Sequence, residues 1–521
     1  MNNLTPISLP DIAAAAVKNM YSSLDERREC LPFFTYRLFD KDISLEHGEF
    51  DSPHVVGRYL DGLWMAERAF GIRANKDIVK SLWKHMSKAL KAGEHRGDGL
   101  AWNEQTGTQP AGAWGHNQRE ALLGILGASH MLESEEILCT AQALVKGIAR
   151  TTDHQGCFPA GRLTEQGWTD AGVLGPLPAQ SGRMVRALLQ LYRQSKNELA
   201  LQLAKEIAQL NRDRCFSPGG TWLQDAGIHV HSITGTITAL LDLALLTRDS
   251  GLLDHARAAF DRGAAGYRSS YGWVLETRGT EHERGEANNT GDVLEAAILL
   301  AHNVDPAYWD DAERILRNHL VKSQLRDPKL FKDSEAMPES ETRIFKGVAA
   351  RAAGGFCFSS PADFKSHDGD TAPINTDLVG GATQALCEAY EAATEESTSE
   401  ISVNLLIDKS IGGTRVRSHI PQEGKVEVDV SNSKRLKVRI PARADRNTVR
   451  LKVGGKEARP EWSGPYVRVC GELQSFHVTI EFELDRFTAV ETLNGREYNV
   501  QWVGDTVTGV EGSRVRFKPL Y

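Results

Sequence analysis

The hydrophobic periodicity of this 521-residue chain changes near residue 400. Up to about residue 395, long Ala- and Leu-rich stretches repeat apolar side chains at the spacing of an amphipathic helix. From about residue 400, short β-branched runs such as KVEVDV and RLKVRIP alternate apolar and polar residues, separated by Gly, Asn, Asp and Pro. The sequence therefore predicts a mainly α domain over residues 1–395 and a β-sandwich over residues 400–521.

The helical part repeats a pair of unlike helices six times. The first helix of each pair is polar and amphipathic, near 11–23, 75–92, 134–150, 197–213, 250–267 and 306–322. The second is richer in Gly, Ala and small polar residues, near 53–70, 116–131, 181–195, 232–247, 290–302 and 377–393. A helix without a polar face is buried on both sides, as the inner helices of a double ring are. The pattern predicts an (α/α)6 barrel.

Composition and charge exclude several classes of partner. The formal net charge is −8, which argues against nucleic acid, because phosphate binding needs a basic face. No apolar run approaches the ~18–20 residues that span a bilayer, so no membrane partner is expected. The seven scattered cysteines lack C-x-x-C spacing and the N-terminus lacks the pattern of a secretory signal. We expect a cytoplasmic protein, and a homodimer is left open.

Polar residues recur just before each of the six predicted inner helices. In a helical barrel these junctions surround one funnel, which makes them candidates for substrate binding. The candidates are Asp51, His54, Arg58, Trp114, Asn117, Arg183, Trp222, His229, Glu286, Asn288 and Asn289. Each residue alone is explained as well by a helix cap or a structural ion pair. Their recurrence at one topological place favours a site, because buried polar groups are costly unless they bind something.

The fifth junction, ERGEANNTGDVLEAAILL, gives the first candidate for catalysis. Glu295 lies in an otherwise apolar helix, where a carboxylate is either paired or has a raised pKa, as a general acid requires. Glycoside hydrolysis needs two carboxylates, and Asp377, Asp292 and Glu286 are the candidates for the second. We therefore predict Glu295 as the general acid, with Asp377 or Asp292 as its partner.

Other chemistries have weaker support. His116 and His231 are alternative groups for proton transfer. The His229-x-His231 spacing can bind zinc, but no third ligand is evident, so we predict neither a metal nor a cofactor. The chain has no G-x-S-x-G elbow, Walker loop or dinucleotide fingerprint, which disfavours an esterase, a kinase or a dehydrogenase.

Three segments resemble the β-L-arabinofuranosidases of glycoside hydrolase family 127 and their relatives. They are GEANNTGDVLEAAILLAH, the run GGATQALCEAYE followed by ISVNLLI, and the tail FELDRFTAVETLNGREYNVQWVGDTVTGV. The resemblance implies an (α/α)6 barrel followed by β-sandwich domains and a carbohydrate context. It also implies that Glu295 takes the place of the family's catalytic glutamate.

The sequence departs from that family where its metal is bound. The family uses a zinc-bound cysteine nucleophile, with one cysteine two residues after the glutamate and a Cys-Cys pair before the last barrel helix. This chain has Ala297 at the first place and PINTDLVGG at the second. Neither the zinc–thiolate chemistry nor the arabinofuranoside substrate therefore carries over.

Several functions stay open. The leading one is a glycoside hydrolase acting on a short oligosaccharide, with a uronate-containing one as an option, because Arg58 and Arg183 suit a carboxylate. The runner-up is a polysaccharide or glycoside lyase that eliminates at a uronate, which would make His116, His231 and Arg183 central. A sugar epimerase and a non-catalytic sugar-binding protein are further alternatives, since one fold hosts many functions.

The missing cysteines generate a prediction about metal content. We expect no zinc held by cysteine, because no thiolate lies at the family's positions around Glu295 and before Leu378. Metal analysis of protein purified without chelators should find substoichiometric zinc. Full zinc occupancy that is lost together with activity on chelation would contradict the prediction.

Overall fold

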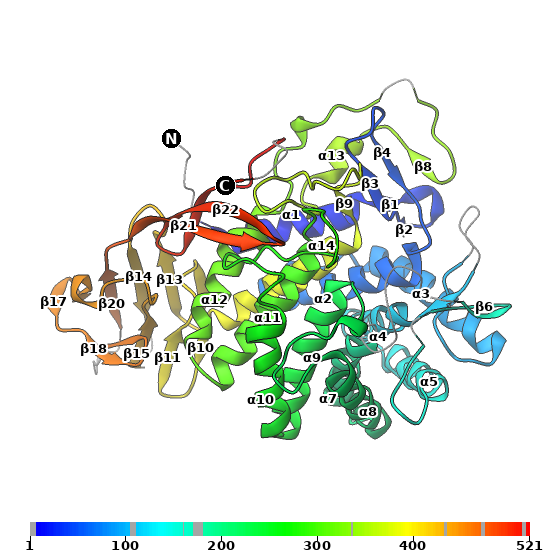
Figure 1. The fold of residues 1–521 in the computed structure, drawn as a ribbon, viewed down its shortest axis with the longest axis horizontal. Helices are drawn as coiled ribbons and strands as arrows, with labels where there is room; N and C mark the ends of the chain where they lie inside the picture. Colours follow the sequence, from blue (N-terminus) through cyan, green and yellow to red (C-terminus); the bar gives the residue numbers. More distant parts are fainter. Residues whose placement is uncertain are drawn as a thin grey trace.

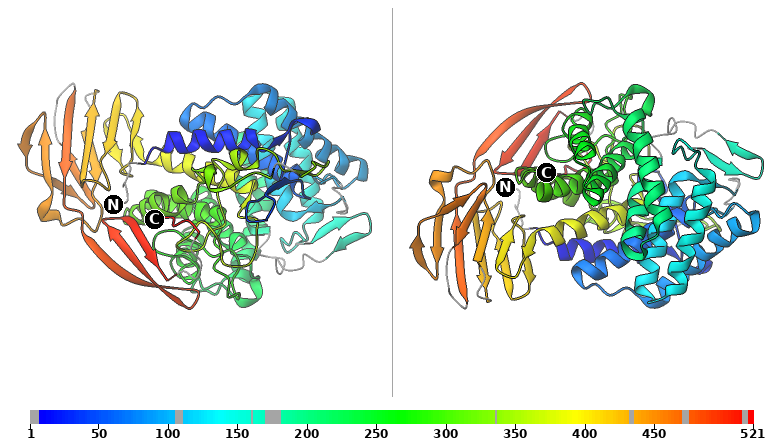
Figure 2. Two further views of the ribbon diagram at one scale, coloured as in Figure 1. Left: turned by 90° about the horizontal axis from the view of Figure 1, so that it is seen from above. Right: turned by 90° about the horizontal axis from the view of Figure 1, so that it is seen from below.

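The computed structural model describes residues 7–521 except 105–110, 160, 170–180, 335–336, 432–434, 470–474 and 513–516. Helices fill most of the chain up to Ala392, and β-strands follow from Thr394 onward (Figure 1). The helical part and the two sheets that follow it lie at opposite ends of the molecule (Figure 2). The predicted order, helices first and strands second, is therefore present.

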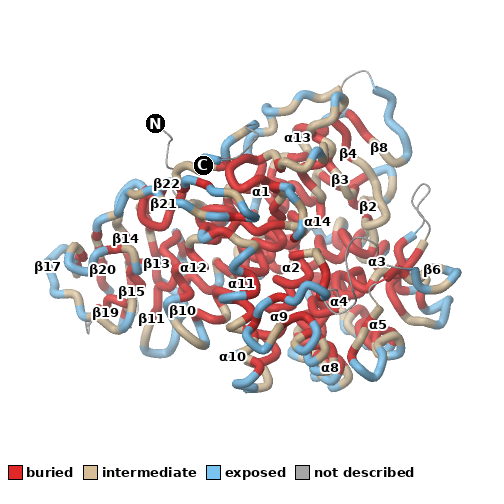
Figure 3. Tube along the Cα trace, in the orientation of Figure 1, coloured by how far each residue is buried: buried red, intermediate tan, exposed pale blue. Residues whose placement is uncertain are grey.

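Six inner helices form a closed ring. They are α2 (Val56–Phe70), α4 (Gly115–Met131), α7 (Met184–Ser195), α9 (Val230–Thr247), α11 (Ala287–Asn303) and α14 (Asp377–Ala392). Each packs against the next, and α14 packs against α2 to complete the circle. Most of their residues are buried, as expected for helices covered on both sides (Figure 3).

Outer helices cover this ring on its outer side. They are α1 (Leu9–Ser22), α3 (Lys76–Arg96), α5 (Glu135–Thr151), α8 (Glu198–Cys215), α10 (Ser250–Ala258) and α12 (Tyr308–Ile315). α3 and α5 bury one apolar stripe and expose the opposite face, which is the amphipathic pattern that the sequence predicts. Small antiparallel sheets lie among the loops: β1 (Leu24–Asp25) with β2 (Leu31–Pro32); β3 (Thr35–Arg37), β4 (Ser44–Glu46), β8 (Arg343–Ile344) and β9 (Ile374–Asn375); and β5 (Ala113–Trp114), β6 (Arg162–Thr164) and β7 (Gly167–Thr169).

Glycines let some inner helices approach closely. A Cβ on Gly57 of α2 would lie 2.2 Å from the backbone oxygen of Glu120 in α4. A Cβ on Gly380 of α14 would lie 2.8 Å from the Cβ of Arg58 in α2. Neither distance leaves room for a side chain, so α2 touches both neighbours through bare backbone. The small-residue composition of the inner helices therefore has a direct packing reason.

Helix α9 is long and apolar enough to cross a membrane by length and composition, which the sequence analysis did not foresee. Its mean hydropathy is 1.4 over 18 residues, but 83% of these residues are buried inside the protein. α9 is one of the ring helices, and burial from both sides accounts for its apolar character.

The first part of the β region is a two-sheet sandwich. One sheet has the order β10 (Thr394–Glu396), β11 (Glu400–Val403), β15 (Arg435–Arg439), β19 (Tyr466–Val469) and β18 (Glu461–Ser463). The other has the order β12 (Lys409–Ile411), β13 (Thr414–Ser418), β14 (Lys425–Val430), β20 (Phe476–Glu481), β16 (Arg450–Val453) and β17 (Lys456–Ala458). Alternate residues of both sheets, such as Val426, Val428 and Val430, form one apolar core.

The last strands leave the sandwich. β21 (Arg486–Leu493), β22 (Arg496–Val503) and β23 (Thr506–Glu511) form a separate antiparallel sheet. Its apolar face, including Tyr498 and Trp502, packs on Tyr271 and Trp273 of the helical part. The final quarter of the predicted β domain thus belongs to the wall of the barrel, where it supports the segment that leads into α11.

A buried ion-pair network joins the sandwich to the barrel. Arg439 of β15 pairs with Asp310 and Glu313 of α12. Glu313 also pairs with Arg317 at 2.7 Å, and Arg317 donates a hydrogen bond to the backbone oxygen of Leu406 at 2.8 Å. The side chains of Glu313, Arg317 and Arg439 are at most 2% exposed. Glu313 is therefore the shared anion of two buried guanidinium groups.

Removal of this shared anion should destabilise the protein. Glu313→Gln keeps the shape of the side chain but leaves buried positive charge uncompensated, which typically costs about 3–5 kcal/mol. Urea unfolding at neutral pH measures the loss. Glu400→Gln is the control, because Glu400 pairs with Lys437 in a partly exposed position worth about 0–1 kcal/mol. Equal small losses in both variants would contradict the prediction.

Candidate active site

Polar side chains meet where the inner helices begin. The structure brings together His54, Arg58, His116, Asn117, Arg183, His229, His231, Glu286, Asn288, Asp292 and Asp377. All of them were predicted from the sequence, and they come from the starts of all six ring helices. The helix N-termini also carry partial positive charge, which suits acidic groups.

Two carboxyl groups lie side by side in this cluster. Glu286 is the N-cap residue of α11, and Asp377 is the first residue of α14. The Nδ2 of Asn288 donates to Glu286 Oε1 at 3.0 Å and to Asp377 Oδ2 at 3.1 Å. Because both oxygens contact one nitrogen, they are at most about 6 Å apart. This separation is short enough for both groups to act on one bond.

The surroundings drive the pKa values of these two groups apart. The pKa of Glu286 is raised to about 8, first by burial and then by the charges of Glu276 and Asp377. The hydrogen bond from Asn288 and the charge of Arg183 lower it by less. Burial alone would also raise the pKa of Asp377. The nearby imidazole of His54, 3.7 Å away, and the charge of Arg58 instead hold it below its ordinary value. At neutral pH, Glu286 holds a proton and Asp377 is ionised.

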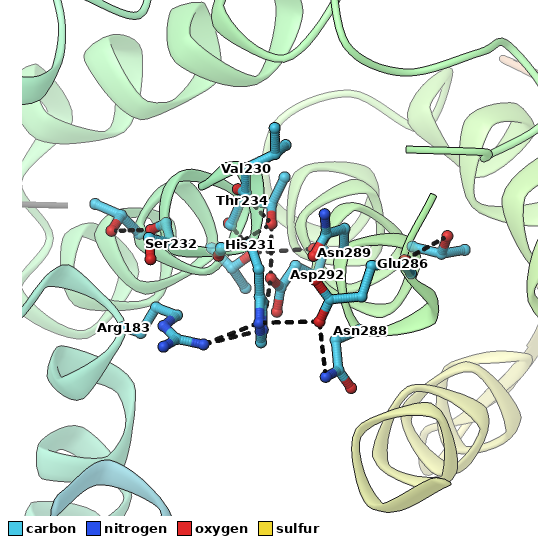
Figure 4. Close-up of polar contacts among 12 residues, drawn as sticks. Arg183, Val230, His231, Ser232, Thr234, Glu286, Asn288, Asn289 and Asp292 are labelled. Atoms are coloured by element: carbon cyan, nitrogen blue, oxygen red, sulfur yellow. Dashed lines mark hydrogen bonds and ion pairs between the residues drawn. The ribbon is translucent and has the colours of Figure 1, made fainter. Parts of the chain in front are cut away.

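Two histidines of α9 and its N-cap flank Glu286. His231 Nδ1 lies 3.3 Å from Glu286 Oε1, and His231 Nε2 lies 3.5 Å from Asp292 Oδ2. Arg183 Nη1 lies 2.9 Å from His231 Nδ1, so the imidazole stands between Arg183 and Glu286 (Figure 4). Burial and then the charge of Arg183 lower the pKa of His231 well below its ordinary value and that of His229 to about 3. Both imidazoles are therefore neutral.

Three of these side chains lie close enough together to be candidate metal ligands. His229, His231 and Glu286 each offer a ligand atom, and these atoms lie within 4.8 Å of one another, so Glu286 is the third group that the sequence did not reveal. However, Arg183 donates to His231 Nδ1 and brings its own positive charge to the place an ion would share. The family's thiolate zinc does not fit either, because no described cysteine joins this group. The absence of a metal stays a prediction.

The floor of the site is a second charged layer. Glu120 of α4 lies 3.0 Å from Arg58 and 2.6 Å from Arg119. Burial would raise the pKa of Glu120, but the charges of Arg119 and Arg58 lower it to about 2. Asp292 accepts a hydrogen bond from Thr234 at 2.7 Å. Glu120 thus contacts Arg58, and Asp292 contacts His231 at 3.5 Å.

Several buried donors of the site have no partner within the described chain. They include Nη2 of Arg58 and Nδ2 of Asn117. The indole nitrogen of Trp114 is a further example. Buried polar groups are nearly always satisfied in native proteins, so these donors are available to water or to a polar ligand.

Glu295 lies at the edge of this cluster, where it borders a small cavity together with Arg58, Asn288 and Asp292. It is nine residues after Glu286 in α11, about 13 Å along the helix axis. It pairs with Arg186, which also pairs with Glu388, and it lines a cavity of about 390 Å³ with Arg193. The sequence argument required an unpaired carboxylate in an apolar helix, and the structure corrects that premise: the alternative, a carboxylate that satisfies a buried arginine, is what is found.

Three other predicted residues have structural contacts. Asp51 accepts hydrogen bonds from His47 at 2.7 Å and from the backbone of Gly48 at 2.9 Å. Asn289 donates to the backbone of Leu275 at 2.9 Å. Trp222 is covered by the guanidinium of Arg278, 3.6 Å from its ring centre. Helix and loop anchoring accounts for these residues without a ligand.

Sequence reasoning missed Glu276. Its segment pairs with the one that leads to Glu286, because the backbone of Glu276 donates to Arg284 and that of Glu286 to Val274. Glu276 pairs with Arg284 at 2.5 Å, and Arg284 also contacts Asp368 at 2.7 Å. In the sequence, only a pairing of the segments WVLETRG and ERGE could have indicated that Glu276 lies near Glu286. These segments are too short and irregular to be recognised as a hairpin.

The comparisons with known proteins concern the fold. No family model matches the chain, and no curated protein matches it. A family 127 β-arabinofuranosidase structure has a TM-score of 0.63 at 12% identity, over 96% of this chain and 81% of its own. The family 127 β-L-arabinofuranosidase from Geobacillus stearothermophilus T6 has a TM-score of 0.58 at 13% identity, over 95% and 80%.

The chain has the fold of these β-L-arabinofuranosidases. An unsaturated glucuronyl hydrolase from Bacillus sp. GL1 has a TM-score of 0.50 at 11% identity, over 73% of this chain and 96% of its own. The structural resemblance that three sequence segments suggested is thus present in three dimensions.

The raised pKa of Glu286 generates a prediction about stability. Between about pH 4.5 and 8 the unfolded chain has released this proton while the folded chain retains it, so the free energy of unfolding falls as the pH rises through this window. Glu286→Gln removes the titration and should become progressively more stable relative to the wild type. Urea unfolding of both proteins across the window measures this.

Asp377→Asn is the control for the sign of this effect. The folded pKa of Asp377 is lowered, so its contribution to stability is lost only as the pH falls below its ordinary value near 3.8. The titration of Asp377 itself therefore adds no change between about pH 4.5 and 8. Loss of its charge lowers the pKa of Glu286, so Asp377→Asn should show a weaker pH-dependent difference of the same sign as that of Glu286→Gln. A constant difference for Glu286→Gln would show that Glu286 is ionised when folded.

Proposed function

We propose that this chain is a glycoside hydrolase that acts on a short, uronate-containing oligosaccharide, with Glu286 as the general acid. The observation that carries the proposal is the Glu286–Asn288–Asp377 arrangement, in which one carboxyl group holds a proton and its neighbour is ionised. The names of similar folds, two β-arabinofuranosidases and an unsaturated glucuronyl hydrolase, support glycosidase chemistry.

The geometry supports a reaction in two steps. Glu286 donates its proton to the glycosidic oxygen while Asp377 Oδ attacks the anomeric carbon, so the C–O bond to the leaving sugar breaks and an ester to Asp377 forms. Ionised Glu286 then takes a proton from water, which attacks the anomeric carbon and releases Asp377. A separation of at most about 6 Å favours this retaining route, because inverting enzymes need about 6.5–9.5 Å for the water.

Neighbouring groups prepare these two carboxyls for their roles. His54, 3.7 Å from Asp377, and the positive charge of Arg58 keep Asp377 ionised. His231 Nδ1 accepts from Arg183, so it is unprotonated and also suits a protonated Glu286 at 3.3 Å. Asn288 donates to both carboxyl groups and so holds them close together.

A lyase is the second candidate, because neutral His231 next to Arg183 provides a base beside a group that neutralises a uronate. Elimination needs that base but has no use for a protonated and an ionised carboxyl at one point. The carboxyl pair therefore favours hydrolysis. Incubation with uronate-containing oligosaccharides separates the cases: a new ultraviolet absorbance indicates elimination, and incorporation of labelled water oxygen indicates hydrolysis.

Substitution of the two carboxyl groups tests the mechanism. Glu286→Gln and Asp377→Asn should each lower kcat/KM by about 10²–10⁴, which is typical for a positioned acid. In the wild type, kcat/KM should fall above about pH 8 as Glu286 loses its proton. This alkaline limb should be absent from the residual activity of Glu286→Gln.

Glu295→Gln is the matched comparison on the same helix. It removes the partner of Arg186 far from the carboxyl pair, so it should lower the melting temperature more than it lowers the rate per folded molecule. The assignment fails if Glu295→Gln is stable but inactive while Glu286→Gln retains full activity, and binding without turnover in the wild type would indicate a sugar-binding protein instead.

A further inference from the structure

Arg183 is a buried cation without a direct ion pair, although the charges of Glu120 and Asp292 act on it from nearby. It precedes α7 and is 5% exposed, yet none of its nitrogens lies within 4.0 Å of a carboxylate in the described chain. Its partner is the neutral ring of His231, and its Nε has no hydrogen-bond partner. Two neighbouring buried arginines differ: Arg58 has Glu120, and Arg186 has Glu295 and Glu388. Arg278, which also lacks a carboxylate, donates instead to the backbone oxygens of Leu223 and Gln224.

A buried charge that no opposite charge contacts directly is costly, and proteins retain one where it binds something. Burial and the charge of Arg119 lower the pKa of Arg183 to about 10, so it is still a cation at neutral pH. The chain also makes room for this group, since a Cβ on Gly235 of α9 would lie 2.8 Å from Arg183 Cγ. The packing around Arg183 therefore accommodates a cation that can bind an anionic ligand.

The position of Arg183 locates that anion on the substrate. Arg183 Nη1 contacts His231 Nδ1 at 2.9 Å. His231 Nδ1 also lies 3.3 Å from Glu286 Oε1. One imidazole thus separates the guanidinium from the acid (Figure 4). A sugar whose glycosidic oxygen faces Glu286 would bring the substituent of its own ring to Arg183. A planar carboxylate suits the fork of a guanidinium better than a hydroxyl does.

We propose that Arg183 is the receptor for the carboxylate of the sugar whose glycosidic bond is cleaved. The inference rests on the proposed function for the position of that bond, and it makes Arg183 the residue that selects a uronic acid over the corresponding neutral sugar. His231 orients the guanidinium through Nη1 and leaves Nε free for the ligand. An anionic group elsewhere on the oligosaccharide would not reach this pocket.

Binding measurements test this without turnover. Calorimetry would compare D-glucuronate and D-galacturonate with D-glucose and D-galactose, using wild-type protein, Arg183→Met and Arg183→Lys. We expect Arg183→Met to weaken uronate binding at least tenfold with little change for the neutral sugars, and Arg183→Lys to lie between. Arg193→Met is the control, because Arg193 is on the same helix and pairs with Asp242 outside the site.

Thermal unfolding distinguishes a receptor from a structural arginine. Because Arg183 has no anionic partner, Arg183→Met should melt no lower than the wild type, and added uronate should raise the melting temperature of the wild type only. A large loss of stability in both Arg183 variants, or equal uronate binding by Arg183→Met, would overturn the inference. Preferential binding of a sugar phosphate or sulfate would overturn the carboxylate assignment.

The inference and the proposed function fail in different ways. Uronate binding that depends on Arg183, without any cleavage, would support Arg183 as the receptor and contradict the proposed hydrolase activity. Cleavage of neutral glycosides that depends on Glu286 but shows no preference for uronates would support the hydrolase and contradict the role of Arg183.

Discussion

The close approach of α2 to α4 and α14 is the constraint on which the site depends. Gly57 and Gly380 have no side chain at the crossings, so the first turns of these helices come together. Arg58 then reaches Glu120 on one side, and His54 reaches Asn117 and Asp377. A larger residue at either glycine would separate the helices and with them the groups that keep Asp377 ionised.

Environment, rather than residue type, gives the two carboxyl groups different roles. Glu286 and Asp377 share the hydrogen-bond donor Asn288, and both are buried. Asp377 has the charge of Arg58 and the nearby imidazole of His54, whereas Glu286 has the Glu276 carboxylate and neutral imidazoles. A charged group is stable in a buried site only where an opposite charge or a donor compensates it. The same arrangement therefore leaves Arg183 dependent on a ligand.

The sequence predicted the arrangement of the fold better than the role of its residues. Helical periodicity and small-residue composition located the six inner helices, and the polar residues before them do converge. The ion pair of Glu295 could not be predicted because its partner Arg186 is 109 positions away, and no local pattern reveals such a pair. Glu286 was a secondary candidate because a residue at a helix N-cap looks like a cap. The sheet β21–β23 was assigned to the sandwich because strand periodicity does not say what a strand packs against.

The departure from the thiolate enzymes of the same fold has a chemical consequence. A chain without their cysteines needs another nucleophile, another way to stabilise its charge, and another positive group beside the acid. In the proposed mechanism, Asp377 supplies a carboxylate nucleophile, His54 and Arg58 help to keep it ionised, and Arg183 supplies the cation next to His231. These groups lie on the first turns of different ring helices or just before them, so such a set can replace another without a change in the core. On the same proposal, the guanidinium of Arg183, which contacts no carboxylate of the chain, ties this set to an anionic substrate.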